Sequence, residues 1–360
     1  MVRFAPAAPI LAAREVALAT LSEGLLDGLG WITEEWLERA TEPGRFLAGA
    51  RTVILLALPY RGADPVPADD VSRGRVARYA RGRDYHRVFE AKLRRMAKTI
   101  RAELRGSARP TVDYGPLLER PLAAAAGMGW LGKSTMLLVP GFGPWVLLGA
   151  IATDLDVAPD EPLKKSCGAC TRCIVACPTG AISAEGNVLD ARLCISYHTI
   201  ENRGPIPREL RAKFGDWIFG CDDCLDACPV GGGNSTTYPD FAPLSSEDAR
   251  PALAPLLSLD EAAFRERYRG RPITRAKRDG FLRNVCVALG NVGGAEDVAA
   301  LAGALIDDSP LVRGHAAWAL GRIGARLGLG SARSLLLARA DVERDETVRE
   351  EIESALQEAK

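Results

Sequence analysis

The sequence predicts an α+β protein of several domains. Its parts are an N-terminal α/β domain (residues 1–157), a cysteine-rich module (158–238), and a linker followed by C-terminal helical repeats (239–360). Three observations support this order. A short apolar run lies in the first part, eight of the nine cysteines lie close together in the second, and one pattern occurs twice in the third. A chain of 360 residues is long enough for two or three domains.

Composition narrows the classes of function. The 46 Lys and Arg balance the 46 Asp and Glu, which excludes a wholly basic protein that coats nucleic acid but leaves room for local basic patches. The alanine-rich N-terminus is interrupted by Arg14 and Glu15 and is a poor signal peptide, so we expect a cytoplasmic protein. Residues 134–153 carry no charge, but Pro140 and Pro144 interrupt them, which predicts a buried β-hairpin rather than a membrane helix.

Periodicity predicts the elements of the first part. Residues 1–50 have apolar positions at helical spacing, and Thr33 before two glutamates is typical of a helix start. Residues 52–58 form a continuous apolar run, which predicts a strand buried on both faces. Residues 84–104 are again helical in pattern. The twelve Lys and Arg against three acids over 71–105 are by default a solvated face.

Asp113 is the candidate general acid of the chain. It stands where a strand is expected to end, before a turn at Gly115-Pro116 and a helix over 117–126. The alternative is an ordinary turn or cap aspartate. His86 and His198 are rival acids, although a lone histidine is more often structural.

The glycine-rich stretch after this helix matches a phosphate-binding loop only in form. Gly127-x4-Gly132-Lys133-Ser134 fits the pattern, but a helix-like run precedes it and a strand-like run follows it, so we reject a nucleoside-triphosphate site. We expect the glycines to let the backbone approach a large flat ligand, with Lys133 and Ser134 as polar contacts.

The cysteine spacing predicts two cubane iron–sulfur clusters. A Cys-x2-Cys-x2-Cys-x3-Cys-Pro run is followed by Cys-x2-Cys-x3-Cys-Pro, which lacks a first cysteine because Ile218 stands there. Cys194, between the runs, completes eight ligands. By the rule that the fourth cysteine of a run binds the other cluster, the sets are Cys167, Cys170, Cys173 and Cys228, and Cys177, Cys194, Cys221 and Cys224. Two zinc sites or a disulfide framework are the weaker alternatives.

A repeat closes the chain. After a proline-rich, linker-like segment (238–259), the pattern Val287-Ala-Leu-Gly-Asn-Val-Gly recurs as Trp318-Ala-Leu-Gly-Arg-Ile-Gly. Leu289 and Leu320 hold the same place in the two copies, which gives a period of 31 residues. Such a period predicts paired helices of a short HEAT-like solenoid. Cys286 lies on its apolar face as a core thiol, and residues 264–283 hold eight basic residues against two acids.

Two clusters form a relay that needs an electron acceptor. Because no dinucleotide-binding fingerprint follows a strand, the acceptor is a flavin, a corrinoid or the substrate itself, and the residues do not choose among them.

The combined motifs resemble the epoxyqueuosine reductases, cobalamin-dependent iron–sulfur enzymes that complete queuosine in tRNA. The resemblance covers about residues 10–330. The matching segments are residues 78–86 (RYARGRDYH), 112–121 (VDYGPLLERP), 127–134 (GMGWLGKS), both cysteine runs, 194–201 (CISYHTIE) and 203–207 (RGPIP). The chain departs from the family pattern at Tyr114, where a small residue is usual, at Ser134 and at His198.

This resemblance implies a fold, cofactors and a mechanism. The N-terminal domain would hold cobalamin in a fold similar to that of reductive dehalogenases. The two [4Fe-4S] clusters would feed it electrons, and the resulting cob(I)alamin would attack the epoxide at the tRNA wobble position. Asp113 would protonate the departing oxygen, and loss of water would give queuosine. The implied cobalamin contacts are Tyr79, Asp84, Asp113, Lys133, Ser134, Ser196 and Tyr197.

The resemblance also implies partners. The basic segments would contact tRNA phosphates, with Arg203, Arg269, Arg271 and Lys277 as candidates. An external electron donor of the flavodoxin or ferredoxin type, or a chemical reductant, would reduce the clusters, and we expect a monomer without a membrane partner. Two alternatives are a corrinoid reductive dehalogenase-like reductase of small molecules, and a ferredoxin-like electron carrier fused to a binding module.

Overall fold

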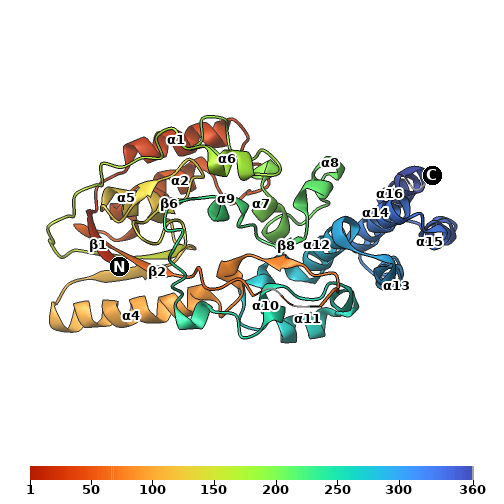
Figure 1. Ribbon diagram of the computed structural model, residues 1–360. Coiled ribbons are helices and arrows are strands. Elements are labelled where there is room, and N and C mark those ends of the chain that lie inside the picture. Colours follow the sequence, from red (N-terminus) through yellow and green to blue (C-terminus); the bar gives the residue numbers. More distant parts are fainter. Residues whose placement is uncertain (66, 68, 359–360) are drawn as a thin grey trace. The chain divides into compact units, whose positions relative to one another are not determined.

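The computed structural model describes residues 1–65, 67 and 69–358, and the chain forms two compact units. Unit 1 consists of residues 1–63, 83–192 and 222–242, and unit 2 of residues 64–82, 193–221 and 243–360. Each unit therefore combines segments that are distant in the sequence (Figure 1). The three-domain division at residues 157 and 238 stays a prediction.

Unit 1 is organised around a four-stranded antiparallel sheet in the order β1-β2-β7-β4. The strands are β1 (Val2–Pro6), β2 (Thr52–Pro59), β4 (Ala108–Thr111) and β7 (Val146–Thr153). The first six residues of β2 are buried, which agrees with a strand covered on both faces. The structure thus contains the strand expected at 52–58 and adds β1, which helical spacing over residues 1–50 does not predict.

The structure corrects the β-hairpin predicted over 134–153. β6 (Leu137–Leu138) pairs back with β5 (Trp130–Leu131), and only an isolated bridge between Val139 and Gly143 closes the proline-containing turn. β7 instead joins the central sheet between β2 and β4. An apolar run specifies that a strand is buried but not which strand it pairs with.

Helices cover both faces of this sheet. α4 (Tyr85–Glu103) packs on β4 and β7, and α5 (Glu119–Ala125) packs from the other side (Figure 1). Asp84 caps α4, whose buried Phe89, Leu93 and Ala97 recur at helical spacing while most basic side chains face outward. The remaining helices of unit 1 are α1 (Leu11–Ser22), α2 (Glu34–Ala40), α3 (Pro43–Phe46), α6 (Arg172–Ala176) and α9 (Asp223–Asp226). Thr33 caps α2, as predicted, by accepting the N–H of Trp36 at 3.1 Å.

Unit 2 packs short elements on its repeat helices. A parallel pair of strands, β3 (Arg75–Val76) and β8 (Trp217–Phe219), lies against α12. The short helices are α7 (Ile195–Ile200), α8 (Arg208–Arg211), α10 (Ser246–Ala249) and α11 (Glu261–Arg267). In the described parts of both units, the 3-10 helices are η1 (Arg78–Ala80), η2 (Ala191–Leu193), η3 (Ala212–Phe214), η4 (Pro239–Phe241), η5 (Ala254–Ser258), η6 (Pro272–Ala276) and η7 (Ala295–Asp297).

The linker expected at 238–259 is folded. Its residues from 243 onward carry α10 and η5, and Leu253 and Leu256 are fully buried in the core of unit 2. Two of its prolines, Pro239 and Pro255, lie at the start of 3-10 helices.

The C-terminal helices confirm the predicted repeat. They are α12 (Lys277–Val292), α13 (Val298–Ala304), α14 (Pro310–Leu327), α15 (Gly330–Ala340) and α16 (Glu346–Glu358), and α14 packs against both α12 and α16 (Figure 1). Leu289 and Leu320 are equivalent buried positions, and Cys286 is a fully buried core thiol, as expected. Among the described residues, none of the helices has both the length and the apolar character needed to cross a membrane.

Candidate active site and cluster ligands

The first predicted cluster set lies together in unit 1. Cys167, Cys170 and Cys173 surround the start of α6, and Cys228 follows α9, which packs against α6. Burial raises the pKa of the Cys173 and Cys228 thiols, and the charges of nearby cysteines raise it further. Cys167 and Cys170 contribute to both shifts, so each lies within electrostatic range of Cys173 and of Cys228. Four neighbouring thiols fit the donor set of one cubane cluster.

The second predicted set is distributed differently along the chain. Cys177 and Cys224 belong to unit 1, and Cys194 and Cys221 to unit 2. The Cys177 sulfur accepts the N–H of Ala181 at 3.3 Å. The assignment of these four ligands stays a prediction from the spacing. Ile218, which replaces the expected cysteine of the second run, is fully buried in β8 and serves the core of unit 2.

Asp113 occupies a tight, strained turn after β4. Its φ is 56°, and the N–H of Tyr114 donates to the carbonyl of Val112 at 2.5 Å, which closes a γ-turn. A non-glycine residue in this conformation is unusual and directs attention to function. The Asp113 side chain is 57% exposed, so a ligand can reach its carboxylate.

Two side chains at the start of α4 contact the Asp113 carboxylate. The Tyr85 hydroxyl donates to Oδ2 of Asp113 at 2.5 Å, and Nε2 of His86 lies 3.3 Å from the same oxygen. Nδ1 of His86 lies 2.8 Å from Oδ1 of Asp84, which also accepts the backbone N–H of His86 at 3.0 Å. The two carboxylates therefore fix the orientation of the imidazole between them.

The electrostatics place the proton of this group on His86. Burial would lower the pKa of His86, but its hydrogen bonds with Asp113 and Asp84 outweigh burial and raise the pKa to about 9. Loss of water on the covered side of the carboxyl group would raise the pKa of Asp113, but the hydrogen bonds from His86 and Tyr85 lower it to about 2. At neutral pH the resting site therefore holds an imidazolium and a carboxylate.

Glu119 lies behind the same turn. Its Oε1 accepts the backbone N–H of Asp113 at 2.8 Å. Burial raises the pKa of Glu119 to about 7, and repulsion by Asp113 adds to the effect. Sequence reasoning missed both Tyr85 and Glu119. Their signal was present, because both lie inside the segments 78–86 and 112–121 that carry the family resemblance.

The other predicted cobalamin contacts have different environments. In unit 1, Asp84 caps α4 and holds His86, the partly exposed Lys133 packs its stem near Gly186, and Ser134 is only 6% exposed. Asp113 and Lys133 are thus accessible polar groups that fit contacts to a large cofactor, whereas Ser134 is mostly covered. Tyr79, Ser196 and Tyr197 belong to unit 2, and their contacts stay predictions.

The structure gives the glycines of 127–134 an internal role. A Cβ on Gly127 would collide with the carbonyl of Glu161, and a Cβ on Gly129 would collide with the carbonyl of Leu138. These glycines allow close packing within the protein, and the ligand approach that the sequence suggested stays a prediction. The structure agrees with the rejection of a phosphate-binding loop, since α5 precedes this stretch and β6 follows it.

Four arginines and lysines in unit 2 were predicted to contact tRNA. Arg269 and Lys277 are exposed, although Arg269 pairs with Glu266. Arg203 donates to the carbonyls of Ile200 and Ala276 and lines, with Lys277, a cavity of about 420 Å³. Arg271 is mostly covered and pairs with Asp248, so it has a structural partner already.

The rival histidine has a different environment from His86. His198 is 4% exposed, and its Nδ1 lies 3.1 Å from the side-chain nitrogen of Asn202. It belongs to unit 2, on α7. Its burial favours a structural role.

Three segments match known families. Residues 41–114 match the family described as epoxyqueuosine reductase QueG, residues 166–231 match a 4Fe-4S double cluster binding domain, and residues 274–357 match HEAT repeats. These agree with the cysteine spacing and the C-terminal pattern.

Similar whole proteins carry one name. A curated epoxyqueuosine reductase of Xanthomonas campestris pv. campestris is 43% identical over 311 residues, which cover 84% of this chain and 87% of the relative. A crystal structure of epoxyqueuosine reductase with an epoxyqueuosine-modified tRNA-Tyr stem loop has a TM-score of 0.92 at 30% identity, covering 100% of this chain and 94% of that one. A Bacillus subtilis epoxyqueuosine reductase structure, whose catalytic aspartate loop is swung out of the active site, has a TM-score of 0.91 at 30% identity, with coverage of 100% and 95%. These identities and coverages show that the chain belongs to the epoxyqueuosine reductase family.

Proposed function

We propose that Asp113 and His86 act as one acid in the reduction of epoxyqueuosine, with the proton held on His86 at rest and delivered through Asp113. The reaction follows from the family: epoxyqueuosine in tRNA is reduced to queuosine, with cobalamin and two [4Fe-4S] clusters as cofactors. The relatives do not favour a small-molecule dehalogenation.

The chemistry of the reaction sets what the protein must supply. Opening the epoxide and releasing its oxygen as water consumes two electrons and two protons. The bound cofactors supply the electrons. The chain's own residues must therefore bind the nucleoside, orient it and deliver protons to the departing oxygen, one from His86 through Asp113 and the second from solvent.

One observation carries the proposal: Nε2 of His86 and Oδ2 of Asp113 lie 3.3 Å apart. With a pKa of about 2, Asp113 alone is ionised at neutral pH and has no proton to give. His86, with a pKa of about 9, is protonated and held in place by Asp84. The exposed Asp113 contacts the substrate oxygen, takes the proton from His86 and passes it on, which is general acid catalysis by a coupled pair.

The test is single-turnover reduction of an epoxyqueuosine-modified stem loop by the protein loaded with clusters and cobalamin. Mass spectrometry of the nucleosides reports loss of one oxygen. We expect Asp113→Asn and His86→Gln each to slow the reaction by about 100-fold or more, the usual contribution of a general acid. His198→Gln is the matched histidine variant and should react at the wild-type rate. A normal rate for His86→Gln would refute the pair, and a normal rate for Asp113→Asn would refute the role of Asp113.

We further propose that Arg203, Arg269 and Lys277 contact tRNA phosphates. All three side chains are exposed, and Arg203 and Lys277 also line the cavity described above. Arg271 remains a candidate, with less charge to offer because Asp248 pairs with it. Lys277→Glu should weaken stem-loop binding and reduce its salt dependence, because binding releases fewer counterions from the tRNA when one phosphate contact is lost. Arg349→Glu, which reverses an exposed charge on α16 outside both basic segments, is the control.

The source of electrons and the assembly state complete the proposal. We propose an external donor of the flavodoxin or ferredoxin type, replaceable by a chemical reductant, and a monomer in solution. Sedimentation of the loaded protein and reduction assays with each donor test these two points.

A further inference from the structure

We propose that Tyr114 and Glu90 form a tether that positions the Asp113 turn against His86. This inference rests on the proposed role of Asp113 as the group that delivers the proton. It adds two positioning residues whose hydrogen bond to each other involves neither the Asp113 carboxylate nor the His86 imidazole.

The turn needs outside support. Asp113 has a φ of 56°, and the Val112–Tyr114 hydrogen bond closes a γ-turn of the rare, strained kind. Position 115, which follows Tyr114, must be glycine, because a Cβ on Gly115 would collide with the side chain of Thr111. A backbone in such a conformation persists only where surrounding contacts hold it.

The tether comes from the same helix as the proton. The Tyr114 hydroxyl donates to Oε1 of Glu90 at 2.7 Å. His86 and Glu90 are four residues apart on α4, so they lie one above the other on one face of the helix. Two consecutive residues of the turn, Asp113 and Tyr114, therefore bind two consecutive positions of that face, which sets the distance between Asp113 and His86.

The hydroxyl rather than ring burial makes this contact. Tyr114 is 59% exposed, and its ring lies 6.1 Å from the imidazole of His86, a ring contact that phenylalanine would keep. Glu90 is also paired with Arg94 at 2.5 Å, which holds the acceptor in place. Its pKa is lowered, first by the Tyr114 hydrogen bond, while burial and Glu90 raise the pKa of Tyr114 to about 12, so the phenol keeps its proton at neutral pH.

The experiment compares Tyr114→Phe, Glu90→Ala, Glu90→Gln and the Tyr114→Phe/Glu90→Ala double variant. Glu103→Ala, an exposed acid at the end of α4, is the control. Two readouts are made on the fully loaded protein: kcat and KM for the modified stem loop, and amide hydrogen exchange of residues 112–116. The exchange readout does not depend on turnover.

We expect Tyr114→Phe to lower kcat about five-fold, the size of one hydrogen bond, with KM unchanged and faster exchange in the turn. Glu90→Ala should match it, and the double variant should be no worse than either single variant. Glu90→Gln keeps an acceptor oxygen and should restore most of the rate. Wild-type kcat and exchange in Tyr114→Phe would overturn the tether.

Two further outcomes distinguish the tether from a tRNA contact of the Tyr114 ring and from a failure of the proposed function. If Tyr114→Phe is normal but Tyr114→Ala raises KM, the ring contacts tRNA and the tether is wrong. If Asp113→Asn is fully active while Tyr114→Phe speeds exchange, the proposed function fails and the tether becomes a structural contact only, which also overturns its positioning role.

Discussion

His86 and Asp113 shift each other's pKa in opposite directions across a 3.3 Å contact. Burial works against both charged forms, and the hydrogen bonds outweigh it in both cases. The protein therefore keeps an ion pair at a site where catalysis needs a mobile proton, and the pH dependence of folding should report that pair.

The first prediction concerns this pH dependence. His86 has its pKa raised from 6.5 to about 9, so its stabilising effect is fully present below pH 6.5 and is lost as pH rises through 9. Asp113 has its pKa lowered from 3.8 to about 2, so its effect is present above pH 3.8 and is lost as pH falls through 2. The Tm difference between wild type and His86→Gln should be largest between pH 3.8 and 6.5, where both effects are fully present, and should shrink above pH 9. A difference that is constant from pH 5 to 10 would contradict the pair.

The second prediction concerns the first cluster. If Cys228 is the fourth ligand beside Cys167, Cys170 and Cys173, then Cys228→Ser should lose about half of the bound iron, since one of two [4Fe-4S] clusters loses a thiolate. Cys286→Ala removes a buried thiol outside both runs and should keep the wild-type iron content. Full iron in anaerobically reconstituted Cys228→Ser would show that this ligand assignment is wrong.

Local patterns predicted what depends on local spacing. The cysteine runs indicated that Cys228 belongs with the first three cysteines, and the structure brings these sulfurs near one another. The repeated Ala-Leu-Gly pattern predicted packed helices, and Thr33 predicted a helix start. Each of these signals lies within a few residues or repeats at a fixed period.

Long-range pairing was not predictable in the same way. The run that became β7 looked like half of a hairpin, because its apolar residues do not specify β2 as the partner. Asp113 was singled out, but its partners Tyr85 and His86 come from a helix start separated from it by α4 and β4. A single sequence does not show which side chains of two such elements meet.

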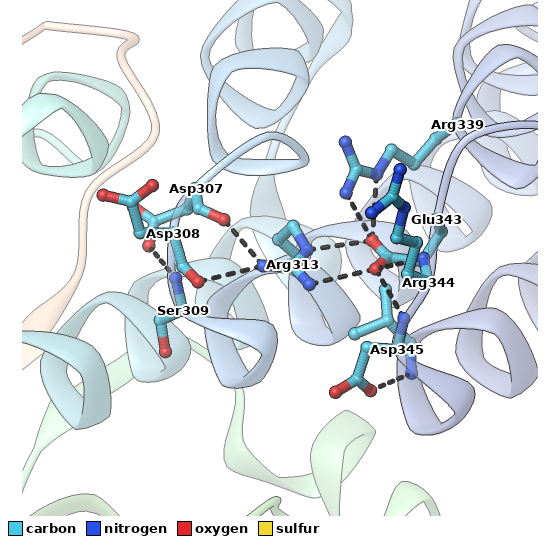
Figure 2. Close-up of polar contacts among 9 residues, drawn as sticks. Asp307, Asp308, Ser309, Arg313, Arg339, Glu343, Arg344 and Asp345 are labelled. Atoms are coloured by element: carbon cyan, nitrogen blue, oxygen red, sulfur yellow. Dashed lines mark hydrogen bonds and ion pairs between the residues drawn. The ribbon is translucent and has the colours of Figure 1, made fainter.

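The third prediction concerns Glu343, which joins α14 to α15 and binds the backbone of the turn just before α16 (Figure 2). Its carboxylate accepts from Arg313 at 2.8 and 3.0 Å, from Arg339 at 2.6 Å, and from the N–H groups of Arg344 and Asp345 at 2.9 Å. Its side chain is only 1% exposed. Burial would raise its pKa, but these hydrogen bonds lower it to about 2.

Glu343→Gln should therefore lower the free energy of unfolding by about 3 kcal/mol at pH 7, because it leaves two arginines near a neutral partner. The pKa is lowered from 4.5, so the stabilising effect is present above pH 4.5 and is lost as pH falls towards 2. The difference from wild type should shrink over that range in urea unfolding. Glu353→Gln, an exposed position of α16, should change stability by less than about 0.5 kcal/mol.

The last prediction concerns the glycines of the repeat. A Cβ on Gly290 of α12 would collide with the ring of Trp318 on α14, and a Cβ on Gly321 of α14 would lie 2.7 Å from Cβ and 2.9 Å from Cα of Ala355 on α16. The same position of the pattern thus faces the corresponding helix of the following repeat in both copies, α14 for Gly290 and α16 for Gly321. Alanine favours helix by about 1 kcal/mol over glycine, but overpacking costs about 1–3 kcal/mol, so the balance should be destabilising.

We expect Gly290→Ala and Gly321→Ala each to lower the Tm. Gly303→Ala is the matched control, because Gly303 lies in the neighbouring helix α13 and a Cβ there has no atom within 4 Å among those that could block it. That variant should be neutral or more stable by about 0.5–1 kcal/mol, the ordinary gain from replacing glycine inside a helix. Stabilisation by all three substitutions would mean that helix spacing adjusts freely. The repeated glycine would then reflect something other than close approach of the helices.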